Sequence, residues 1–289
     1  LKLKKHTFYE KDIDKYINNF YDKNFHIQKN FKNINANVYI ISVGTPVNKL
    51  KKTNFSNLKK VSKIIAKNIN KQDLIILRST VEIGTTRNIV VPIIEKSSKL
   101  IAGKDFNIAF CPERTIEGNA LNELQHLPQL IGGYTESCYL AASNFFSFFS
   151  KTIINMNSTE YAEIAKLIDN SYRDYNFGFS NLLSVICSDL NMNASTLINK
   201  INTGYPRNNI PLPSPGVGGP CLSKDPYLFS NSLLSKNKFE KNTLINSRKI
   251  SKKIIKKIVE VIKVEVNKLN IKRKLNIFIL GIAFKGNPP

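Results

Sequence analysis

The sequence predicts an α/β fold built on a parallel, doubly wound sheet. Three observations predict it: short apolar segments rich in β-branched residues, stretches with helical spacing between them, and short connections. In such folds, ligands bind outside the carboxyl ends of the strands. The residues that follow each predicted strand are therefore the first candidates for a binding site.

Each predicted strand ends in small or polar residues, which a ligand could approach. Helical spacing of apolar residues predicts helices over 57–69 and 84–94, between the strands. The alternative is that these strand ends are ordinary βα turns, and composition leaves both open. The strands and their ends are 38–43 with Gly44, Thr45 and Pro46; 74–77 with Ser79 and Thr80; and 106–110 with Cys111, Pro112 and Glu113.

The pattern changes after residue 157. A long helix is predicted over 158–190, capped by Ser158-Thr159-Glu160 and acting as a scaffold between domains or as a dimer surface. Its apolar side holds Ala162, Ala165, Ile168, Tyr172 and Phe179. A loop rich in proline and glycine is predicted over 204–226, a basic helix over 241–268 and a strand over 275–280. The predicted domains are 1–156, 157–256 and 257–289.

Composition narrows the class of protein. Lys and Arg outnumber Asp and Glu by 43 to 21, giving a net charge of +22, which suits either a nucleic-acid binder or a protein with solvated lysine faces. No apolar run is long enough for a membrane span, and no signal peptide is visible. The four cysteines are far apart, so neither a zinc site nor a disulfide framework is expected, and a reducing cytoplasm fits.

Cys221 is the strongest candidate for chemistry. It follows the glycine-rich residues 216–220, whose backbone amides can approach a ligand closely, and it precedes Asp225 by four residues. A carboxylate at that spacing can hold a water or steer a proton near the thiol. The alternative is a buried, inert cysteine.

Two further pairs have helical spacing. Lys166 and Asn170 would share one face of the long helix, where both could donate to a developing oxyanion. Any surface helix offers such a pair. Glu113 and Glu117 follow the third strand, where one could act as a base on water, or the two could simply begin a helix.

Taken together, the motifs resemble the UDP-glucose/GDP-mannose dehydrogenase family, which oxidises a nucleotide sugar twice at C6. The resemblance covers nearly the whole chain. Its motifs are VGTP at 43–46, STV at 79–81 followed by Gly84-Thr85, CPERTIEGNAL at 111–121, AEIAKLIDNSYR at 162–173, GVGGPCLSKDP at 216–226 and GIAFK at 281–285. It implies an incomplete Rossmann-like NAD-binding domain, a central long-helix domain with the cysteine loop, and the start of a second Rossmann-like domain.

The resemblance also implies a role for individual residues. Cys221 is similar to the family's nucleophile, which carries a thiohemiacetal and then a thioester. Lys166 and Asn170 would stabilise oxyanions, Asp225 would act through water, Glu113 would serve thioester hydrolysis, and Thr80 would order the active-site water. Positions lining NAD are Gly44, Thr45, Ser79, Val81 and Glu117, and positions toward the UDP-sugar are Arg207 (from a neighbouring subunit), Gly218 and Lys285.

The family's glycine-rich dinucleotide turn after the first strand has no counterpart here. We therefore expect an internal fragment that lacks the first βαβ unit and the family's last segment, and that is inactive or nearly so alone. The sequences of 112–124, 127–133 and 203–215 resemble the branch that acts on UDP-N-acetyl-D-mannosamine in surface polysaccharide synthesis, although Ser214 departs from that branch. UDP-glucose and UDP-N-acetylglucosamine are the alternatives.

Two rival functions remain. A basic nucleic-acid-binding α/β protein would cluster its lysines on one face, among aromatic residues. A transferase or hydrolase using Cys221 would need a histidine base, and the only histidines are His6, His26 and His126. The dehydrogenase interpretation explains the motifs together, and it implies a UDP-sugar substrate, a homodimer or higher homo-oligomer, no nucleic acid and no membrane span.

Overall fold

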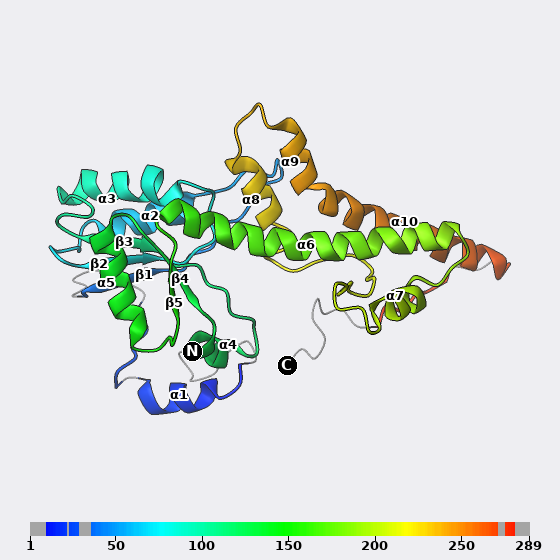
Figure 1. Cartoon of the computed structure of the whole chain (residues 1–289), viewed down its shortest axis with the longest axis horizontal. Helices are drawn as coiled ribbons and strands as arrows, with labels where there is room; N and C mark the ends of the chain where they lie inside the picture. The colour runs from blue at the N-terminus through cyan, green and yellow to red at the C-terminus, as the bar shows by residue number, and fades with distance from the viewer. Residues whose placement is uncertain (1–9, 22, 29–35, 271–274, 281–289) are drawn as a thin grey trace. The chain divides into compact units, whose positions relative to one another are not determined.

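The computed structural model describes residues 10–21, 23–28, 36–270 and 275–280. These residues fall into two compact units that divide within one long helix, between Lys166 and Leu167 (Figure 1). The first unit holds a sheet with helices, and the second is helical. The division into domains 1–156, 157–256 and 257–289 stays a prediction.

The first unit is built on a sheet of five strands, in the order β1-β2-β3-β4-β5. The first three are parallel neighbours, which confirms the predicted parallel sheet. β4 runs antiparallel to β3, a pairing that the sequence analysis does not predict, and β5 is parallel to β4. The strands are β1 (Val38–Ile41), β2 (Leu74–Leu77), β3 (Asn107–Phe110), β4 (Gln129–Gly133) and β5 (Ile153–Asn155).

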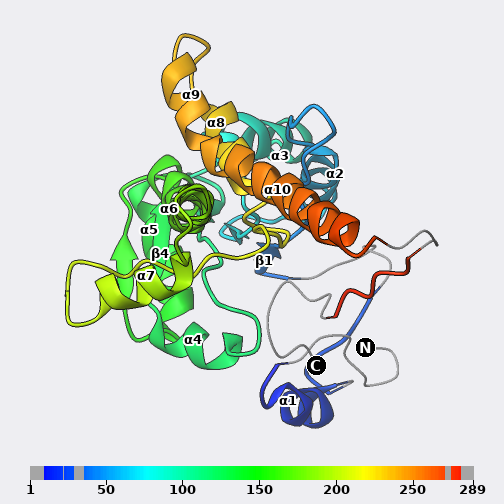
Figure 2. The same ribbon diagram turned by 90° about the vertical axis from the view of Figure 1, so that its right-hand side faces the viewer.

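Helices cover both faces of this sheet because successive strand residues point to opposite sides. Ile75, Leu77 and Phe110 belong to one core cluster with residues of α2 and α3, whereas Ile76 belongs to another with residues of α5. Figure 2 shows α2 and α3 on one side of the sheet and α5 on the other. The helices are α1 (Ile13–Phe20), α2 (Ser56–Ile65), the π-helix η1 (Thr86–Val90), α3 (Val91–Ser98), α4 (Ala120–His126) and α5 (Glu136–Ser147).

The helices predicted over 57–69 and 84–94 are present, the second as η1 followed by α3. The antiparallel strand β4 is harder to find because it ends in Gly132 and Gly133, which resemble a turn. Close packing explains both glycines. A Cβ on Gly132 would lie 2.1 Å from the Ser158 carbonyl oxygen, and one on Gly133 would lie 2.5 Å from the Thr135 carbonyl oxygen.

The long helix predicted over 158–190 is confirmed as α6 (Thr159–Asp189). The Ser158 hydroxyl caps it by accepting the Tyr161 N–H at 3.4 Å. The basic helix predicted over 241–268 is divided at Ile245. The other helices of the second unit are α7 (Ala194–Asn202), α8 (Asp225–Ser232), α9 (Lys238–Leu244) and α10 (Asn246–Lys268).

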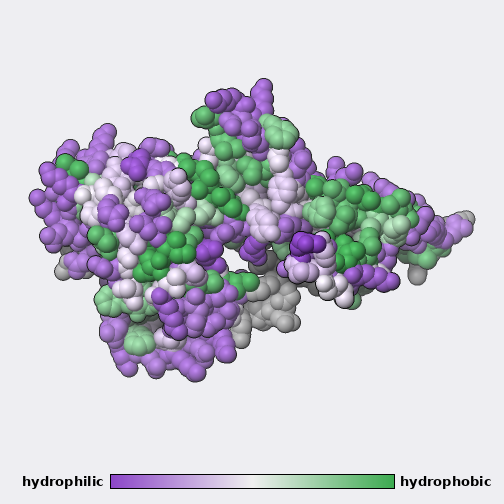
Figure 3. All heavy atoms as spheres, in the orientation of Figure 1, coloured by the Kyte–Doolittle hydropathy of each residue, from purple (hydrophilic) through white to green (hydrophobic). Residues whose placement is uncertain are grey.

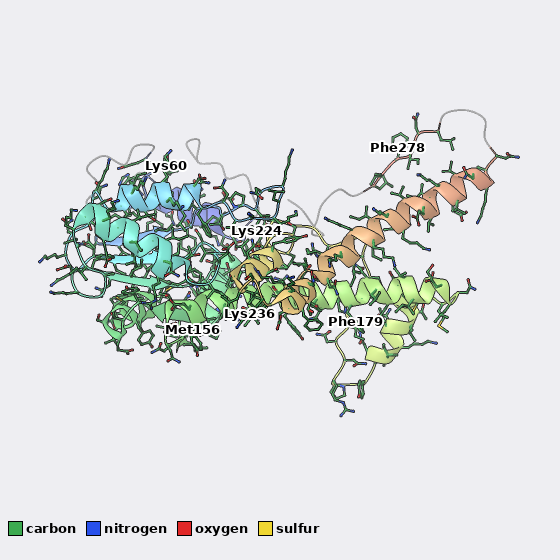
Figure 4. The ribbon with its side chains drawn as sticks, turned by 90° about the horizontal axis from the view of Figure 1, so that it is seen from above. Lys60, Met156, Phe179, Lys224, Lys236 and Phe278 are labelled. Atoms are coloured by element: carbon green, nitrogen blue, oxygen red, sulfur yellow. The ribbon has the colours of Figure 1, made fainter. Side chains whose placement is uncertain are left out.

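The prediction of a strand over 275–280 is wrong. The structure describes these residues, and they form no strand. These residues have no strand beside them, and a strand needs a neighbour to satisfy its backbone hydrogen bonds. Their side chains are largely exposed, Phe278 (labelled in Figure 4) by 88%. Apolar β-branched composition alone does not make a strand.

Within the second unit, the apolar side predicted for α6 is the exposed one. Ile168, Tyr172 and Phe179 (labelled in Figure 4) are 47%, 67% and 50% exposed. The buried side is instead polar and follows helical spacing. Its polar members are Asn170, Ser171, Asp174, Ser180 and Asn181.

Candidate active-site residues

The first group of candidates lies at the carboxyl ends of β1 and β2. The Thr45 hydroxyl donates to the Thr80 carbonyl at 2.5 Å, and the Ser79 hydroxyl donates to the Val43 carbonyl at 2.6 Å. These bonds connect the two strand ends directly. Gly44 is exposed, and a Cβ there would meet nothing within 4 Å, so its surroundings are open to a ligand.

Val81 differs from the other cofactor candidates in this group. The residue as a whole is 1% exposed, and its side chain belongs to the hydrophobic core. The structure thus assigns Val81 to packing beneath the strand ends, beside Thr80, whose side chain is half-buried.

Glu113, beyond the end of β3, is held by an arginine that the sequence analysis missed. Arg78 Nη2 donates to Glu113 Oε2 at 2.6 Å, and the Thr115 N–H donates to Oε1 at 2.8 Å. Burial raises the pKa of Glu113, but these two partners outweigh it and leave the pKa below its usual range. The carboxylate is therefore ionised and oriented. Arg78 also donates to Gln129 at 3.3 Å.

Glu113 and Glu117 do not share a helical turn, so their interpretation as a helix-starting pair is wrong. The first helix after them, α4, begins only at Ala120. Between β3 and α4, the chain follows an irregular path fixed by side chains. Glu10 accepts the Gly118 N–H at 2.9 Å, and Glu123 accepts the Ile116 N–H at 2.7 Å. Glu117 itself is exposed.

A second residue missed by the sequence analysis is Glu163, on the first turns of α6. Its fully buried carboxylate accepts the N–H groups of Gly84 at 2.5 Å and Thr86 at 2.9 Å, and the Thr86 hydroxyl at 2.6 Å. Burial raises its pKa to about 7 despite these donors. Glu163 therefore joins α6 to the start of η1, and its place in the AEIAK motif is the signal that could have found it.

Cys221 is exposed, which contradicts the alternative of a buried, inert cysteine. It lies in the turn between the glycine-rich loop and α8. Its carbonyl accepts the N–H groups of Lys224 at 3.0 Å and Asp225 at 2.9 Å. The other three cysteines of the chain, Cys111, Cys138 and Cys187, are buried.

Asn170 and Asp225, distant in sequence, meet inside the second unit. Asn170 Nδ2 donates to Asp225 Oδ2 at 2.5 Å, and Asp225 is fully buried. Asp225 Oδ1 lies 3.4 Å from Lys224 Nζ (labelled in Figure 4) but accepts no hydrogen bond among the described residues. The role of Asp225 through a water beside Cys221 stays a prediction.

The remaining candidates are placed separately. Lys166 is half-buried on α6, at the end of the first unit and four residues before Asn170. Arg207 is exposed, and its Nε donates to the Tyr205 hydroxyl at 2.8 Å. Gly218 is exposed in the loop. Lys285 and the GIAFK motif lie outside the described residues.

Two other kinds of site receive no support. Over the described ranges there is no cluster of His, Cys, Asp and Glu that could hold a metal ion. In the same residues, no helix is both long and apolar enough to cross a membrane.

Family profiles match two parts of the chain. Residues 1–150 match the NAD binding domain of the UDP-glucose/GDP-mannose dehydrogenase family, and residues 160–252 match its central domain. The chain belongs to this family. The first match supports NAD as the cofactor, and the second contains Lys166, Asn170, Cys221 and Asp225.

Two curated relatives are each 34% identical to the chain. One is the UDP-N-acetyl-D-mannosamine dehydrogenase of Campylobacter jejuni, over 86% of this chain and 61% of the relative. The other is the NDP-N-acetyl-D-galactosaminuronic acid dehydrogenase of Ralstonia solanacearum, over 67% of this chain and 47% of the relative. The chain thus spans about half to three fifths of the length of these relatives.

A solved structure of the same family agrees with the fold. It is the UDP-D-ManNAc dehydrogenase of Pyrococcus horikoshii, 29% identical, with a TM-score of 0.85 over 92% of this chain and 63% of that one. The Rossmann-like architecture implied by the sequence resemblance is therefore confirmed.

Proposed function

We propose that this chain provides the NAD-binding and central parts of a nucleotide-sugar 6-dehydrogenase. The substrate would be UDP-N-acetyl-D-mannosamine, oxidised at C6 to the uronate. The observation that carries the proposal is the exposed thiol of Cys221, next to the buried Asp225–Asn170 pair, inside the match to the family's central domain. No rival function explains all three residues.

The proposed chemistry proceeds in two oxidations. NAD, when bound, would supply the hydride acceptor for C6 in both oxidations, and the proton lost in each oxidation would pass to water. After the first, the Cys221 thiolate adds to the aldehyde carbon and gives a thiohemiacetal. Loss of the second hydride gives a thioester, and water then breaks the C–S bond, releasing the carboxylate and the thiol.

Other side chains would support these steps. Lys166 and one N–H of Asn170 would stabilise the oxyanions at C6. Asp225 would hold a water beside Cys221, while Thr80 would order the active-site water. Glu113, ionised and oriented by Arg78, would assist hydrolysis of the thioester.

The cofactor would bind at the carboxyl edge of β1 and β2. The open surroundings of Gly44 and the direct bonds made by Thr45 and Ser79 fit a ligand lying over this edge. Val81, buried beneath this edge, would support the cofactor site from below, and Glu117 would line the cofactor from the segment after β3. Arg207, Gly218 and Lys285 would contact the UDP-sugar.

We also propose a homodimer formed through the exposed apolar side of α6. The residues there line a groove of about 460 Å³ with Phe229 and Leu244. Figure 3 shows hydrophobic surface over α8 and over the later turns of α6. Tyr172→Glu should weaken the dimer in analytical ultracentrifugation, and Tyr161→Glu, at an exposed position earlier on α6, should not.

The deciding experiment measures NADH absorbance with NAD and one nucleotide sugar at a time. The protein is tested as these 289 residues and as a chain extended to the length of its relatives. UDP-N-acetyl-D-mannosamine, UDP-N-acetylglucosamine, UDP-glucose and the UDP-N-acetylgalactosamine suggested by the Ralstonia relative are compared.

Two NADH per sugar with UDP-N-acetyl-D-mannosamine, lost in Cys221→Ser but kept in Cys187→Ala, would support both substrate and mechanism. Cys187 is the matched control because it removes a buried thiol outside the loop. Oxidation of another sugar alone would contradict the substrate assignment. An unchanged yield of two NADH in Cys221→Ser would contradict the mechanism.

A further inference from the structure

The loop that leads to Cys221 is fastened to the two long helices of the second unit. On the α6 side, Ser180 donates its hydroxyl proton to the Pro211 carbonyl at 2.6 Å. Asn181 accepts the Ser214 N–H at 2.8 Å. On the α10 side, Arg248 Nη1 donates to the Val217 carbonyl at 2.9 Å. Val217 precedes Cys221 by only four residues, so this last bond is the nearest of these three to the thiol.

Arg248 is itself fixed by a buried carboxylate on α6. Its Nε donates to Asp174 Oδ2 at 2.8 Å, and its Nη2 donates to Asp174 Oδ1. Arg248 is 6% exposed and Asp174 is fully buried. The Ser247 hydroxyl also donates to Asp174, and Arg248 Nη2 reaches the Ser251 hydroxyl at 3.3 Å. A guanidinium held in this way has little freedom left.

The helices approach closely enough to bury this pair because Gly178 has no side chain. A Cβ on Gly178 would lie 2.8 Å from the Ser247 Cβ. The loop also uses a conformation suited to glycine, since Gly216 has a φ of +125° and packs toward Ile255 of α10. The bond from Arg248 to Val217 therefore lies at a close, partly buried contact between α6, α10 and the loop.

We infer that Arg248 is a positioning residue for Cys221, acting through the Val217 carbonyl and oriented by Asp174. This inference rests on the proposed function for the role of the thiol. Cys221 lies between two fixed points, the Arg248–Val217 bond four residues before it and the Asn170–Asp225 bond four residues after it. Fastening both sides of a short, glycine-rich segment limits the positions that the thiol can occupy.

Stability alone does not explain the pair. Because two charges must leave water, a buried ion pair stabilises a fold little compared with apolar residues of the same size. A guanidinium has five N–H donors in a fixed plane and can bind a carboxylate and a carbonyl together, which an ammonium on a flexible stem does poorly. Arg248 uses its additional donor, Nη1, to bind the Val217 carbonyl of the loop.

The test uses Cys221 as its own reporter. It is the exposed thiol among four cysteines, so a nitroxide reagent should label it selectively. The mobility of the label is measured by electron paramagnetic resonance, and exchange of the loop amides by mass spectrometry. Arg248→Lys and Arg248→Met are compared with Lys249→Met, which removes an exposed charge from the adjacent position on α10.

Both Arg248 variants should mobilise the label and speed amide exchange in residues 216–220 by about tenfold, the factor for losing one charge-assisted hydrogen bond. Lys249→Met should match the wild type. Because Arg248→Met leaves Asp174 buried without its partner, the double variant Asp174→Asn with Arg248→Met is included. If that folded double variant keeps wild-type label mobility and loop exchange, the inference is wrong.

Activity gives a separate readout in the extended chain. A positioning role predicts that Arg248→Lys lowers kcat and leaves the KM for NAD unchanged. If the wild type oxidises no nucleotide sugar, the proposed function fails, but the label and exchange measurements still decide whether Arg248 positions Cys221. If Arg248→Lys lowers both kcat and thermal stability but leaves the mobility of the label unchanged, the positioning role is contradicted.

Discussion

The strand-end candidates and the cysteine loop are held in place by different kinds of contact. At the ends of β1 and β2, Thr45 and Ser79 bond to backbone carbonyls of the neighbouring strand end. Around Cys221, the contacts come from side chains distant in sequence, such as Asn170 to Asp225 and Arg248 to Val217. Parallel pairing brings strand ends together by itself, whereas the cysteine loop depends on three helices meeting correctly.

This difference predicts different sensitivities to substitution. A bond from a neutral hydroxyl to a backbone carbonyl has a small net value even when it is buried, as at Thr45 and Ser79. Loss of the partner of a buried charged group costs more, because the charge is left unsatisfied in the interior. Substitutions in the second unit should therefore cost more than those at the strand ends.

The largest effect should come from Asn170→Ala. It leaves the fully buried Asp225 carboxylate without its hydrogen-bond donor, at a cost of about 3 kcal/mol. Chemical denaturation monitored by circular dichroism measures the loss. Asn176→Ala, on the same helix at a half-buried position, is the control and should cost less than about 1 kcal/mol. If both variants lose the same free energy of unfolding, the hydrogen bond between Asn170 and Asp225 adds no specific stabilisation.

A pH effect should follow from Glu163, the buried carboxylate that joins α6 to η1. Its pKa is raised from 4.5 to about 7 on folding. Between these values the folded protein keeps a proton that the unfolded chain has lost, so the stabilisation falls as pH rises and is gone above about 7. The effect should amount to about 1 to 3 kcal/mol.

The measurement is the denaturation free energy at pH values across this window, in the wild type and in Glu163→Gln. Because glutamine does not titrate, the difference between the two curves should slope between pH 4.5 and about 7 and be flat above. The histidines are present in both proteins, and their contribution cancels. A flat difference would show that Glu163 keeps an ordinary pKa.

At the strand ends, Thr45→Val should cost only about 1 kcal/mol, the net value of one hydrogen bond. The variant keeps the shape of the side chain and removes its bond to the Thr80 carbonyl. Thermal denaturation measures the change, with exposed Thr196→Val on α7 as the control. A loss as large as that of Asn170→Ala would abolish the contrast between the two regions.

The smallest effect on stability should come from Arg78→Met. The Glu113 side chain is 46% exposed, so solvent screening keeps the value of this ion pair below about 1 kcal/mol. The pKa of Glu113 should nonetheless rise, because burial remains while the guanidinium is lost. A carboxyl titration by nuclear magnetic resonance checks this, with exposed Lys96→Met as the control. An unchanged pKa would mean that Thr115 alone orients the carboxylate.

The sequence predicted the features that depend on local patterns. Apolar β-branched segments located β1, β2 and β3, and helical spacing with the Ser158 cap located α6. The family motifs identified the family, which the profile matches confirm. Motif residues such as Cys221 are found this way because their order along the chain carries the information. Their individual roles stay predictions.

Local patterns failed where distant segments decide the structure. β4 ends in two glycines that resemble a turn until Ser158 and Thr135 are seen packed against them. Residues 275–280 have the composition of a strand but no neighbour in the described chain. Spacing defined an apolar side of α6 but did not decide which side is buried, and in the second unit the buried side is largely polar.

By itself, then, the sequence determined where β1, β2, β3 and α6 lie, which family the chain belongs to and which thiol to examine. Only the tertiary structure decided which polar groups are buried together. Arg78 with Glu113, Glu163 with Thr86, and Arg248 with Asp174 are each separated by 35 or more residues. The physical reason is that a charge is kept in the interior only by a partner, and that partner is chosen by packing, not by spacing along the chain.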